Sequence, residues 1–188
     1  MTIGLVLDPT AVRADDITTP GPDAGPLAGK TVGFRLDEIW RAWDWVAEIW
    51  AAEFEKAGAQ VKFWRSHQGR TGVEGERVAK ALEAFLSSID VAVVGLGNCG
   101  SCTGWTIRDA LAAADKGLPT TAICTEVFEE LGHQLAARGG RSGLRIHILP
   151  YPLNEKSRTE VEPVAYNHLA GVVTTMGATL NTKEEAVG

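Results

Sequence analysis

The chain has 188 residues, of which 45% are hydrophobic and 22% are charged, and its formal net charge at pH 7 is −6. This length and composition are typical of one soluble globular domain, and the negative charge without a basic stripe disfavours nucleic acid as a partner. The apolar run 3–7 ends at once in Asp8 and Pro9, so we expect no signal peptide and no membrane span, and a cytoplasmic location.

Strands and helices are predicted to alternate along the chain. Proline, glycine and aspartate crowd residues 8–29, so we expect an irregular N-terminal arm over 1–29, an α/β domain over 30–180 and a tail over 181–188. Apolar periodicity predicts strands over 30–36, 59–65, 90–96, 119–125 and 145–149, with helices over 37–56, 74–88, 103–116, 127–137 and 160–176 between and after them. This alternation predicts a single doubly wound parallel sheet of about five strands, in the flavodoxin-like order 2-1-3-4-5.

The segment 98–103, which contains Cys99 and Cys102, carries the clearest chemical signal. It joins the predicted buried strand 90–96 to a helical pattern. Unpaired N–H groups and the helix dipole at such a turn stabilise a thiolate. We therefore interpret Cys99 as an exposed nucleophile in the loop and Cys102 as the thiol that resolves its adduct as a disulfide. The structural alternative is that both are small buried apolar residues.

Further candidate residues follow the other strands. Ligands of open α/β sheets bind beyond the carboxyl ends of the strands. Cys124 lies near the end of its strand, so it is a third candidate catalytic cysteine, with a core role as the alternative. The rest of the expected rim consists of Asp37, Glu38, Ser66, His67, Tyr151 and Asn154.

Two rival interpretations use the same residues. The run 95–100 matches G-x-G-x-x-G, and Glu126 ends the following strand, as in a dinucleotide site. That fingerprint normally opens the first βαβ unit, whereas this one opens the third, so we expect no nicotinamide or flavin cofactor. Zinc is the other rival, but the four histidines are scattered and the usual second pair of ligands is missing, so we expect no metal.

The run 95–103, continuing through Trp105 and Asp109 to 119–120 and 124–126, resembles the UGSC family of (seleno)proteins. In that family a selenocysteine or cysteine opens a U/C-Gly-Ser-Cys motif. Residues 27–34 resemble the family's opening strand, and residues 7–10 its leader. The motif is further similar to the selenoprotein B component of glycine reductase, which carries a U-Gly-Thr-Cys-Thr version.

The resemblance implies a redox-active or nucleophilic sulfur at Cys99, with Cys102 as its partner. In glycine-reductase-like chemistry the chalcogenolate attacks carbon and displaces a leaving group, which would give a thioether here. Two positions depart from the expected pattern, because Arg108 and Tyr151 stand where histidine would be commoner. Arg108 is interpreted either as a group that lowers the pKa of Cys99 or holds a carboxylate, or as a solvated helix residue. The candidate substrate-binding residues are Asn98, Gly100, Ser101, Thr103, Arg108, Glu126 and Tyr151.

We therefore predict a small thiol-dependent enzyme that acts on a small electrophilic substrate by nucleophilic or redox chemistry. One alternative is a nucleotide-binding oxidoreductase that uses the glycine-rich turn. The other is a non-catalytic redox carrier or a subunit of a larger complex. Any of these three functions allows the protein to form a homo-oligomer or to bind a partner subunit.

Overall fold

The computed structural model describes residues 13–66 and 71–180. Its centre is a parallel sheet of five strands in the order β3-β2-β4-β5-β6. The strands are β2 (Thr31–Leu36), β3 (Gln60–Arg65), β4 (Val91–Gly97), β5 (Thr120–Thr125) and β6 (Arg145–Leu149). Counted along the chain this is the order 2-1-3-4-5, so the predicted flavodoxin-like sheet is confirmed.

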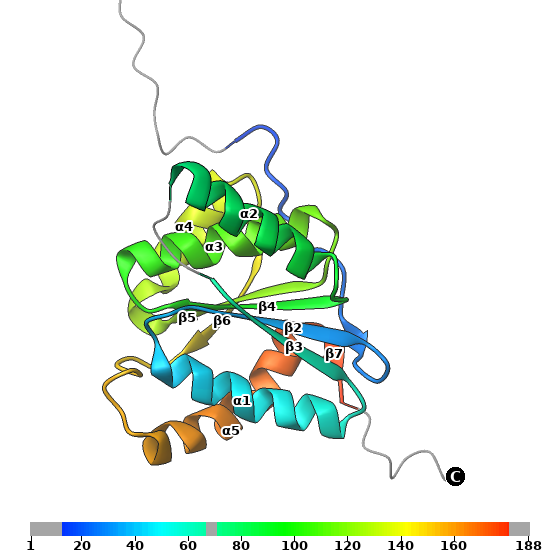
Figure 1. Ribbon diagram of the computed structural model, residues 1–188, viewed down its shortest axis with the longest axis vertical. Coiled ribbons are helices and arrows are strands. Elements are labelled where there is room, and N and C mark those ends of the chain that lie inside the picture. Colours follow the sequence, from blue (N-terminus) through cyan, green and yellow to red (C-terminus); the bar gives the residue numbers. More distant parts are fainter. Residues whose placement is uncertain (1–12, 67–70, 181–188) are drawn as a thin grey trace, which may run out of the picture.

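Helices cover both faces of the sheet (Figure 1). On one face lie α1 (Arg41–Lys56) and α5 (Arg158–Thr175), and on the other lie α2 (Gly72–Leu86), α3 (Gly100–Asp115) and α4 (Glu129–Arg138), the last preceded by the 3₁₀ turn η1 (Glu126–Phe128). Each face buries its own apolar cluster. On the α1 side, Trp43, Trp50 and Phe54 are fully buried, so the aromatic stripe of this helix is core.

All five of the predicted helices begin two to four residues from the expected positions, and the two largest shifts have a clear cause. α1 begins at Arg41 rather than at Asp37, because Oδ1 of Asp37 accepts hydrogen bonds from the amides of Ile39 and Trp40, both at 2.8 Å, and holds a turn there. α3 begins at Gly100 rather than near Thr103, because Cys99 serves as its N-cap. Both shifts move the start of the helix relative to the carboxyl edge of the sheet.

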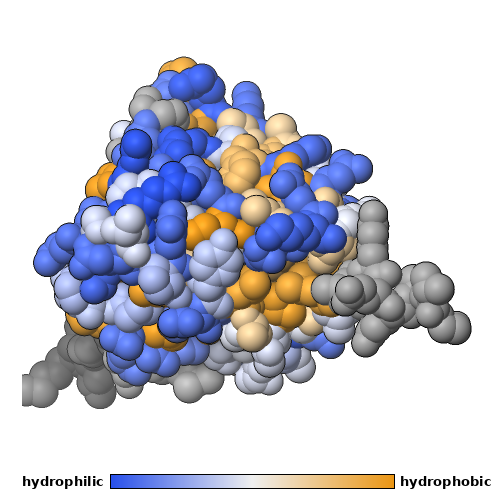
Figure 2. Space-filling model, turned by 90° about the horizontal axis from the view of Figure 1, so that it is seen from below, coloured by the Kyte–Doolittle hydropathy of each residue, from blue (hydrophilic) through white to orange (hydrophobic). Residues whose placement is uncertain are grey.

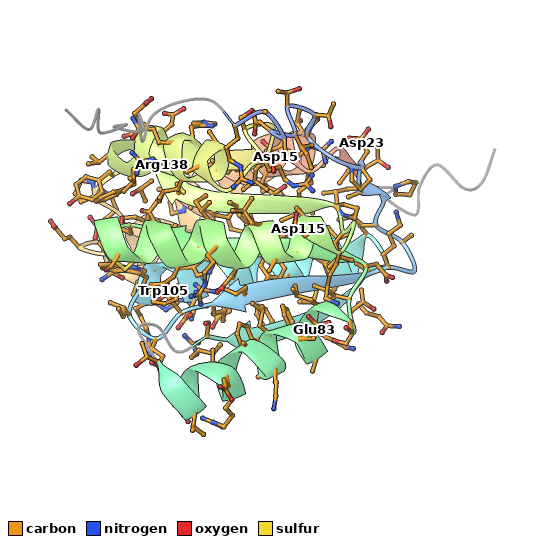
Figure 3. All side chains as sticks on the ribbon, turned by 90° about the horizontal axis from the view of Figure 1, so that it is seen from above. Asp15, Asp23, Glu83, Trp105, Asp115 and Arg138 are labelled. Atoms are coloured by element: carbon orange, nitrogen blue, oxygen red, sulfur yellow. A yellow bond between two sulfur atoms is a disulfide. The ribbon has the colours of Figure 1, made fainter. Side chains whose placement is uncertain are left out.

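The described part of the N-terminal arm docks on the domain. The amide of Ile17 donates to the carbonyl of Gly140 at 2.9 Å, and the amide of Ser142 donates to Asp16 at 2.8 Å. Figure 3 shows the arm with Asp15 and Asp23 passing beside α4 and its residue Arg138. Further on, β1 (Gly25–Pro26) pairs with β7 (Ala178–Thr179), two short strands that the sequence did not indicate. The leader 7–10, His67 and the tail 181–188 lie outside the described residues.

The surface on the side of α1 and α5 is mixed in character. Seen from that side, hydrophobic surface gathers in one area with hydrophilic side chains around it (Figure 2). Half-buried apolar residues that pack against this core include Trp45, Leu169 and Val173. In the ranges that the structure describes, no helix is long and apolar enough to cross a membrane.

Candidate active site

The candidate site lies at the topological switch point of the sheet. β2 lies between β3 and β4 in the sheet, and the chain leaves β2 into α1 on one face and leaves β4 into α3 on the other (Figure 1). The loops after β2 and β4 therefore diverge at the carboxyl edge. A hydrogen bond of 3.3 Å from the amide of Leu96 to Oδ2 of Asp37 joins the two strand ends. In open α/β sheets this is the position at which ligands bind.

Cys99 and Cys102 form a disulfide at this position, with their Cα atoms 5.1 Å apart. Cys99 is the N-cap of the 16-residue helix α3, and its sulfur accepts a hydrogen bond of 3.1 Å from the amide of Cys102. A sulfur thus fills the place that a serine or aspartate oxygen usually takes at a helix N-terminus. Cys99 is half-buried, whereas Cys102 is 1% exposed, so an attacking group reaches Cys99 first.

Of the residues next to the two cysteines, some are buried and hydrogen-bonded to the loop, and others are exposed. Buried Asn98 accepts a hydrogen bond of 3.0 Å from the hydroxyl of Thr125, and buried Thr103 donates to the carbonyl of Cys99 at 2.7 Å. Both side chains hold the loop. Exposed Ser101 places its hydroxyl 3.4 Å from the sulfur of Cys99, and Gly100 is also exposed. Ser101 is therefore a predicted binding residue whose hydroxyl contacts the Cys99 sulfur.

Cys124 is completely buried, beside Gly97 and Gly132. Burial, and then the carboxylate of Glu129, raise the pKa of Cys124 to about 12. A protonated and inaccessible thiol is a poor nucleophile, so its burial favours the core alternative for Cys124 over the catalytic one.

In the reduced, folded protein we expect iodoacetamide at pH 8 to modify Cys99 and to leave Cys124 unmodified, because the core thiol is both protonated and out of reach. Peptide mass spectrometry before and after unfolding in urea measures the difference. Modification of Cys124 at equal rates in the two samples would contradict this placement.

The glycines of the G-x-G-x-x-G run have explanations within the chain. A Cβ on Gly95 would lie 2.6 Å from the ring of Trp43, and one on Gly97 would lie 2.7 Å from the sulfur of Cys124. Gly100 would meet nothing within 4 Å. Interior packing therefore accounts for the first two glycines without a bound pyrophosphate.

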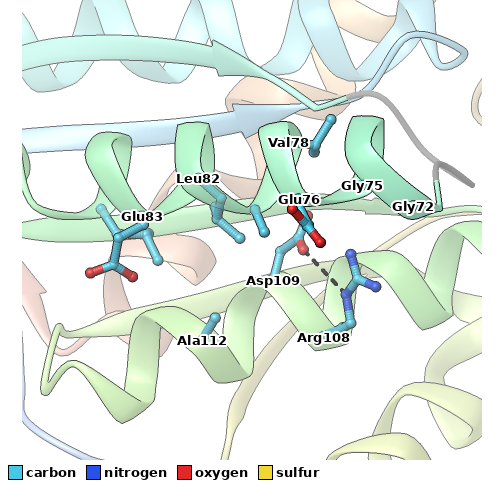
Figure 4. Close-up of a pocket in the computed structure, with 11 residues that line it drawn as sticks. Gly72, Gly75, Glu76, Val78, Leu82, Glu83, Arg108, Asp109 and Ala112 are labelled. Atoms are coloured by element: carbon cyan, nitrogen blue, oxygen red, sulfur yellow. Dashed lines mark ion pairs between the residues drawn. The ribbon is translucent and has the colours of Figure 1, made fainter.

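Arg108 lies along α3, in a groove between α2 and α3 (Figure 4). Eight residues of helix, about 12 Å along the axis, separate it from Gly100. Its guanidinium carbon lies 3.8 Å from the centre of the Trp105 ring, and its Nε lies 3.8 Å from Oδ1 of Asp109. The groove has a volume of about 600 Å³. These contacts tie Arg108 to its own helix, so the prediction that it acts on Cys99 is not supported.

A buried ion pair beneath the site was missed by the sequence analysis. Arg35, the last residue but one of β2, is 1% exposed and donates from Nε to Oδ2 of Asp109 at 2.9 Å. Its Nη2 also lies 2.8 Å from that oxygen. Its Nη1 donates to the carbonyl of Gly95 at 2.9 Å. Arg35 therefore ties β2, the end of β4 and α3 together where the cysteine loop begins. The available signal was an arginine inside an otherwise apolar strand.

Glu126 and Tyr151 meet at the neighbouring strand ends. The amide of Tyr151 donates to Oε2 of Glu126 at 3.3 Å, and the Tyr151 ring packs edge-on against Phe128 with centroids 6.3 Å apart. Both side chains are exposed beside the loop that Asn98 and Thr125 brace. These two predicted binding residues therefore lie at the same edge of the sheet as the disulfide.

Other predicted rim residues serve the fold. Asp37 holds the turn before α1, and Oδ1 of Asn154 accepts a hydrogen bond of 3.2 Å from the amide of Ala42 in the first turn of that helix. Ser66 is buried. Among residues 13–66 and 71–180, no group of three or more His, Cys, Asp or Glu side chains could hold a metal ion.

A doubly wound α/β domain with a Cys-x-x-Cys disulfide at its switch point defines a class of protein, the flavodoxin-like domain that carries a dithiol. The chain belongs to the UGSC family, whose family model matches residues 5–178. A comparison with curated proteins finds no match, so the similarity to the glycine reductase component stays a prediction.

Two solved structures of mutants of the flavo di-iron protein from Thermotoga maritima resemble the fold. Each is 9% identical in sequence and covers 78% of this chain, with TM-scores of 0.44 and 0.40. The chain spans only 37% of the length of those proteins. The fold assignment therefore depends on the strand order itself.

Proposed function

We propose that this protein is a thiol-dependent enzyme in which Cys99 is the nucleophile and Cys102 is the resolving thiol. The observation that carries the proposal is the Cys99–Cys102 disulfide at the N-terminus of α3, with the Cys102 amide 3.1 Å from the Cys99 sulfur. In the reduced protein the same amide and the helix dipole favour a thiolate at Cys99. The cytoplasmic location that we propose fits, because cytoplasmic disulfides are usually catalytic or redox-sensing.

The proposed reaction is a two-electron reduction of a small electrophile R–X. The thiolate of Cys99 attacks R, an S–R bond forms, and X leaves with its electron pair. The thiolate of Cys102 then attacks the sulfur of Cys99, which forms the disulfide and releases R with the electron pair of the broken S–R bond. R takes a proton and leaves as R–H. The dithiol has been oxidised and R–X has been reduced.

Several polar side chains next to the exposed side of Cys99 could contact a small substrate. The hydroxyl of Ser101 is 3.4 Å from the sulfur and can donate a hydrogen bond to the leaving group or to the thiolate. Glu126 and Tyr151 border the same edge and are the proposed substrate contacts. Asn98 and Thr103 are positioning residues, since their hydrogen bonds fix the loop that carries the nucleophile.

The proposal is tested by the pH dependence of alkylation in Cys102→Ser, a variant that keeps Cys99 reduced. We expect the midpoint of the alkylation rate of Cys99 to lie at least 1 pH unit below the free-cysteine value of about 8.5, because the helix N-terminus stabilises the thiolate. Peptide mass spectrometry of iodoacetamide-treated samples gives the rate at each pH.

The same variant unfolded in urea is the matched control, and its midpoint is expected to return to about 8.5. A folded-state midpoint at or above that value would contradict thiol catalysis. A non-catalytic redox module is the alternative function that the same disulfide supports. Turnover of small electrophiles by the wild-type protein, lost in Cys99→Ser, separates the enzyme from this alternative.

A further inference from the structure

Four large exposed apolar side chains follow the strands on the two sides of β4, the strand that leads to Cys99. Ile39 follows β2 and is 54% exposed, Val73 follows β3 and is 84% exposed, Val127 follows β5 and is 63% exposed, and Tyr151 follows β6 and is 43% exposed. Ile39, Val127 and Tyr151 lie within three residues of the ends of their strands, and Val73 is the second residue of α2, the helix after β3. We call Ile39, Val73, Val127 and Tyr151 the apolar rim.

The other large exposed apolar side chains of the described residues lie on three separate elements. Three other large apolar residues are exposed in the described ranges, and they lie on the arm, on β3 and on α5: Ile17, Phe63 and Tyr166. Single exposed apolar residues are ordinary, whereas several gathered on one edge mark an interaction site. The rim is therefore a candidate docking surface, and the disulfide lies within it.

The accessibility of the two sulfurs decides how this disulfide is reduced. Cys102 is 1% exposed, so a reducing thiolate has to attack the sulfur of half-buried Cys99 and expel Cys102. Thiol–disulfide exchange depends on which sulfur is attacked and on access to it. A reductant that reaches Cys99 comes into contact with the surrounding rim.

Charge at this edge favours one kind of reductant over another. Three exposed carboxylates, Glu126, Glu129 and Glu130, flank Val127, and the net charge of the chain is −6. An anionic small thiol such as glutathione is repelled by the carboxylates beside Val127 and buries little of the rim. A protein with apolar surface around its own dithiol gains from covering these side chains.

We propose that the apolar rim is the docking surface for a dithiol protein that reduces the Cys99–Cys102 disulfide. This inference rests on the proposed function, because it assigns the reductant of the same site. The partner's thiolate attacks the sulfur of Cys99 and forms an intermolecular disulfide, and Cys102 leaves as a thiolate and takes up a proton. The partner's second thiol then attacks its own bonded sulfur and releases Cys99. The partner is oxidised, and this chain gains two electrons.

The test compares two reductants on two matched double variants. In Ile39→Ser/Val127→Ser we expect the second-order rate of reduction by a thioredoxin to fall about tenfold, equal to about 1.4 kcal/mol, because apolar contact is lost. The rate with dithiothreitol is expected to stay unchanged, since that small reagent needs no docking surface. The control Ile17→Ser/Tyr166→Ser removes exposed apolar residues elsewhere and is expected to change neither rate.

Three results would overturn the docking surface: an unchanged thioredoxin rate in the rim variant, an equal loss in the control variant, or reduction by glutathione as fast as by thioredoxin. An oxidised wild-type protein without the Cys99–Cys102 disulfide would overturn the proposed function as well. The two failures are distinguishable, because the disulfide is measured on the wild-type protein by peptide mass spectrometry before any rim variant is used.

Discussion

Replacing Asp109 with alanine is expected to lower the free energy of unfolding by about 3–5 kcal/mol. The substitution removes the counter-ion of Arg35, whose guanidinium is buried on β2 and cannot reach water. An unpaired buried charge is far more costly than the loss of an exposed ion pair. Urea unfolding followed by circular dichroism measures the change from the midpoint and slope.

Two further variants separate the buried pair from a general effect on α3. Asp115 lies on the same helix, is 70% exposed and pairs with Arg141 at 3.2 Å, so Asp115→Ala is expected to cost at most about 1 kcal/mol. The double variant Arg35→Met/Asp109→Leu removes both charges and is expected to recover much of the loss. If both alanine variants lost the same free energy of unfolding, burial would add nothing to the cost of leaving Arg35 without its counter-ion, and the inference would be wrong.

This ion pair also bears on the position of the cysteines. Arg35 donates to the carbonyl of Gly95, four residues before Cys99, and Asp109 lies on the helix that Cys99 caps. The strand end and the helix are therefore fixed to the same guanidinium. A reaction between Cys99 and Cys102 requires the two sulfurs at bonding distance, so a rigid support directly below the loop favours their pairing.

The sheet and the position of the cysteine loop could be predicted because they follow from local patterns. Segments with strand periodicity alternate with segments with helix periodicity, which implies right-handed βαβ crossovers and a parallel sheet. In such a sheet a Cys-x-x-Cys pair that follows a strand lies at the carboxyl edge. The spacing of Cys99 and Cys102 also permits the disulfide observed at the start of α3. Each of these inferences depends on neighbours within a few residues.

The contacts that could not be predicted join residues far apart in the chain. Arg35 and Asp109 are 74 residues apart, and neither reveals its partner in the sequence. Arg108 is only nine residues after Cys99 in the sequence, but the rise of the helix places it about 12 Å along the axis from Gly100. The early start of α3 depends on a sulfur acting as a helix cap, which ordinary capping patterns do not indicate.

The histidines illustrate the same limit, because the sequence shows them scattered while the structure brings two of them together. Nε2 of His147 on β6 lies 3.2 Å from Nδ1 of His168 on α5, and Nδ1 of His147 lies 3.3 Å from the hydroxyl of Thr175. The ring also packs edge-on against Trp50. Burial, and then His168, lower the pKa of His147 to about 4. Burial lowers the pKa of His168 too, and Glu126 opposes that shift.

The stability of the protein is expected to fall as the pH is lowered from about 6.5 towards 4. Over this range His147 takes up a proton in the unfolded chain, where its pKa is near 6.5, but not in the folded protein, where its pKa is about 4. The unfolded state then binds more protons, so acid favours unfolding. The full shift corresponds to about 3 kcal/mol, present above pH 6.5 and lost by pH 4. Urea unfolding at half-unit pH steps measures the slope.

A variant that cannot titrate at this position isolates the contribution of His147. In His147→Gln the amide can still form hydrogen bonds with Thr175 and His168, but it does not titrate. The free energy of unfolding of this variant is therefore expected to vary less between pH 6.5 and 4 than that of the wild type. His133→Gln, which replaces an exposed histidine on α4, should retain the wild-type slope. Equal slopes for all three proteins would mean that His147 is protonated in the folded state at the same pH as in the unfolded chain. Burial of the His147 ring favours the opposite result, because it disfavours the charged imidazole. Protonation of both rings would also break the hydrogen bond between them, since a doubly protonated pair has no acceptor nitrogen.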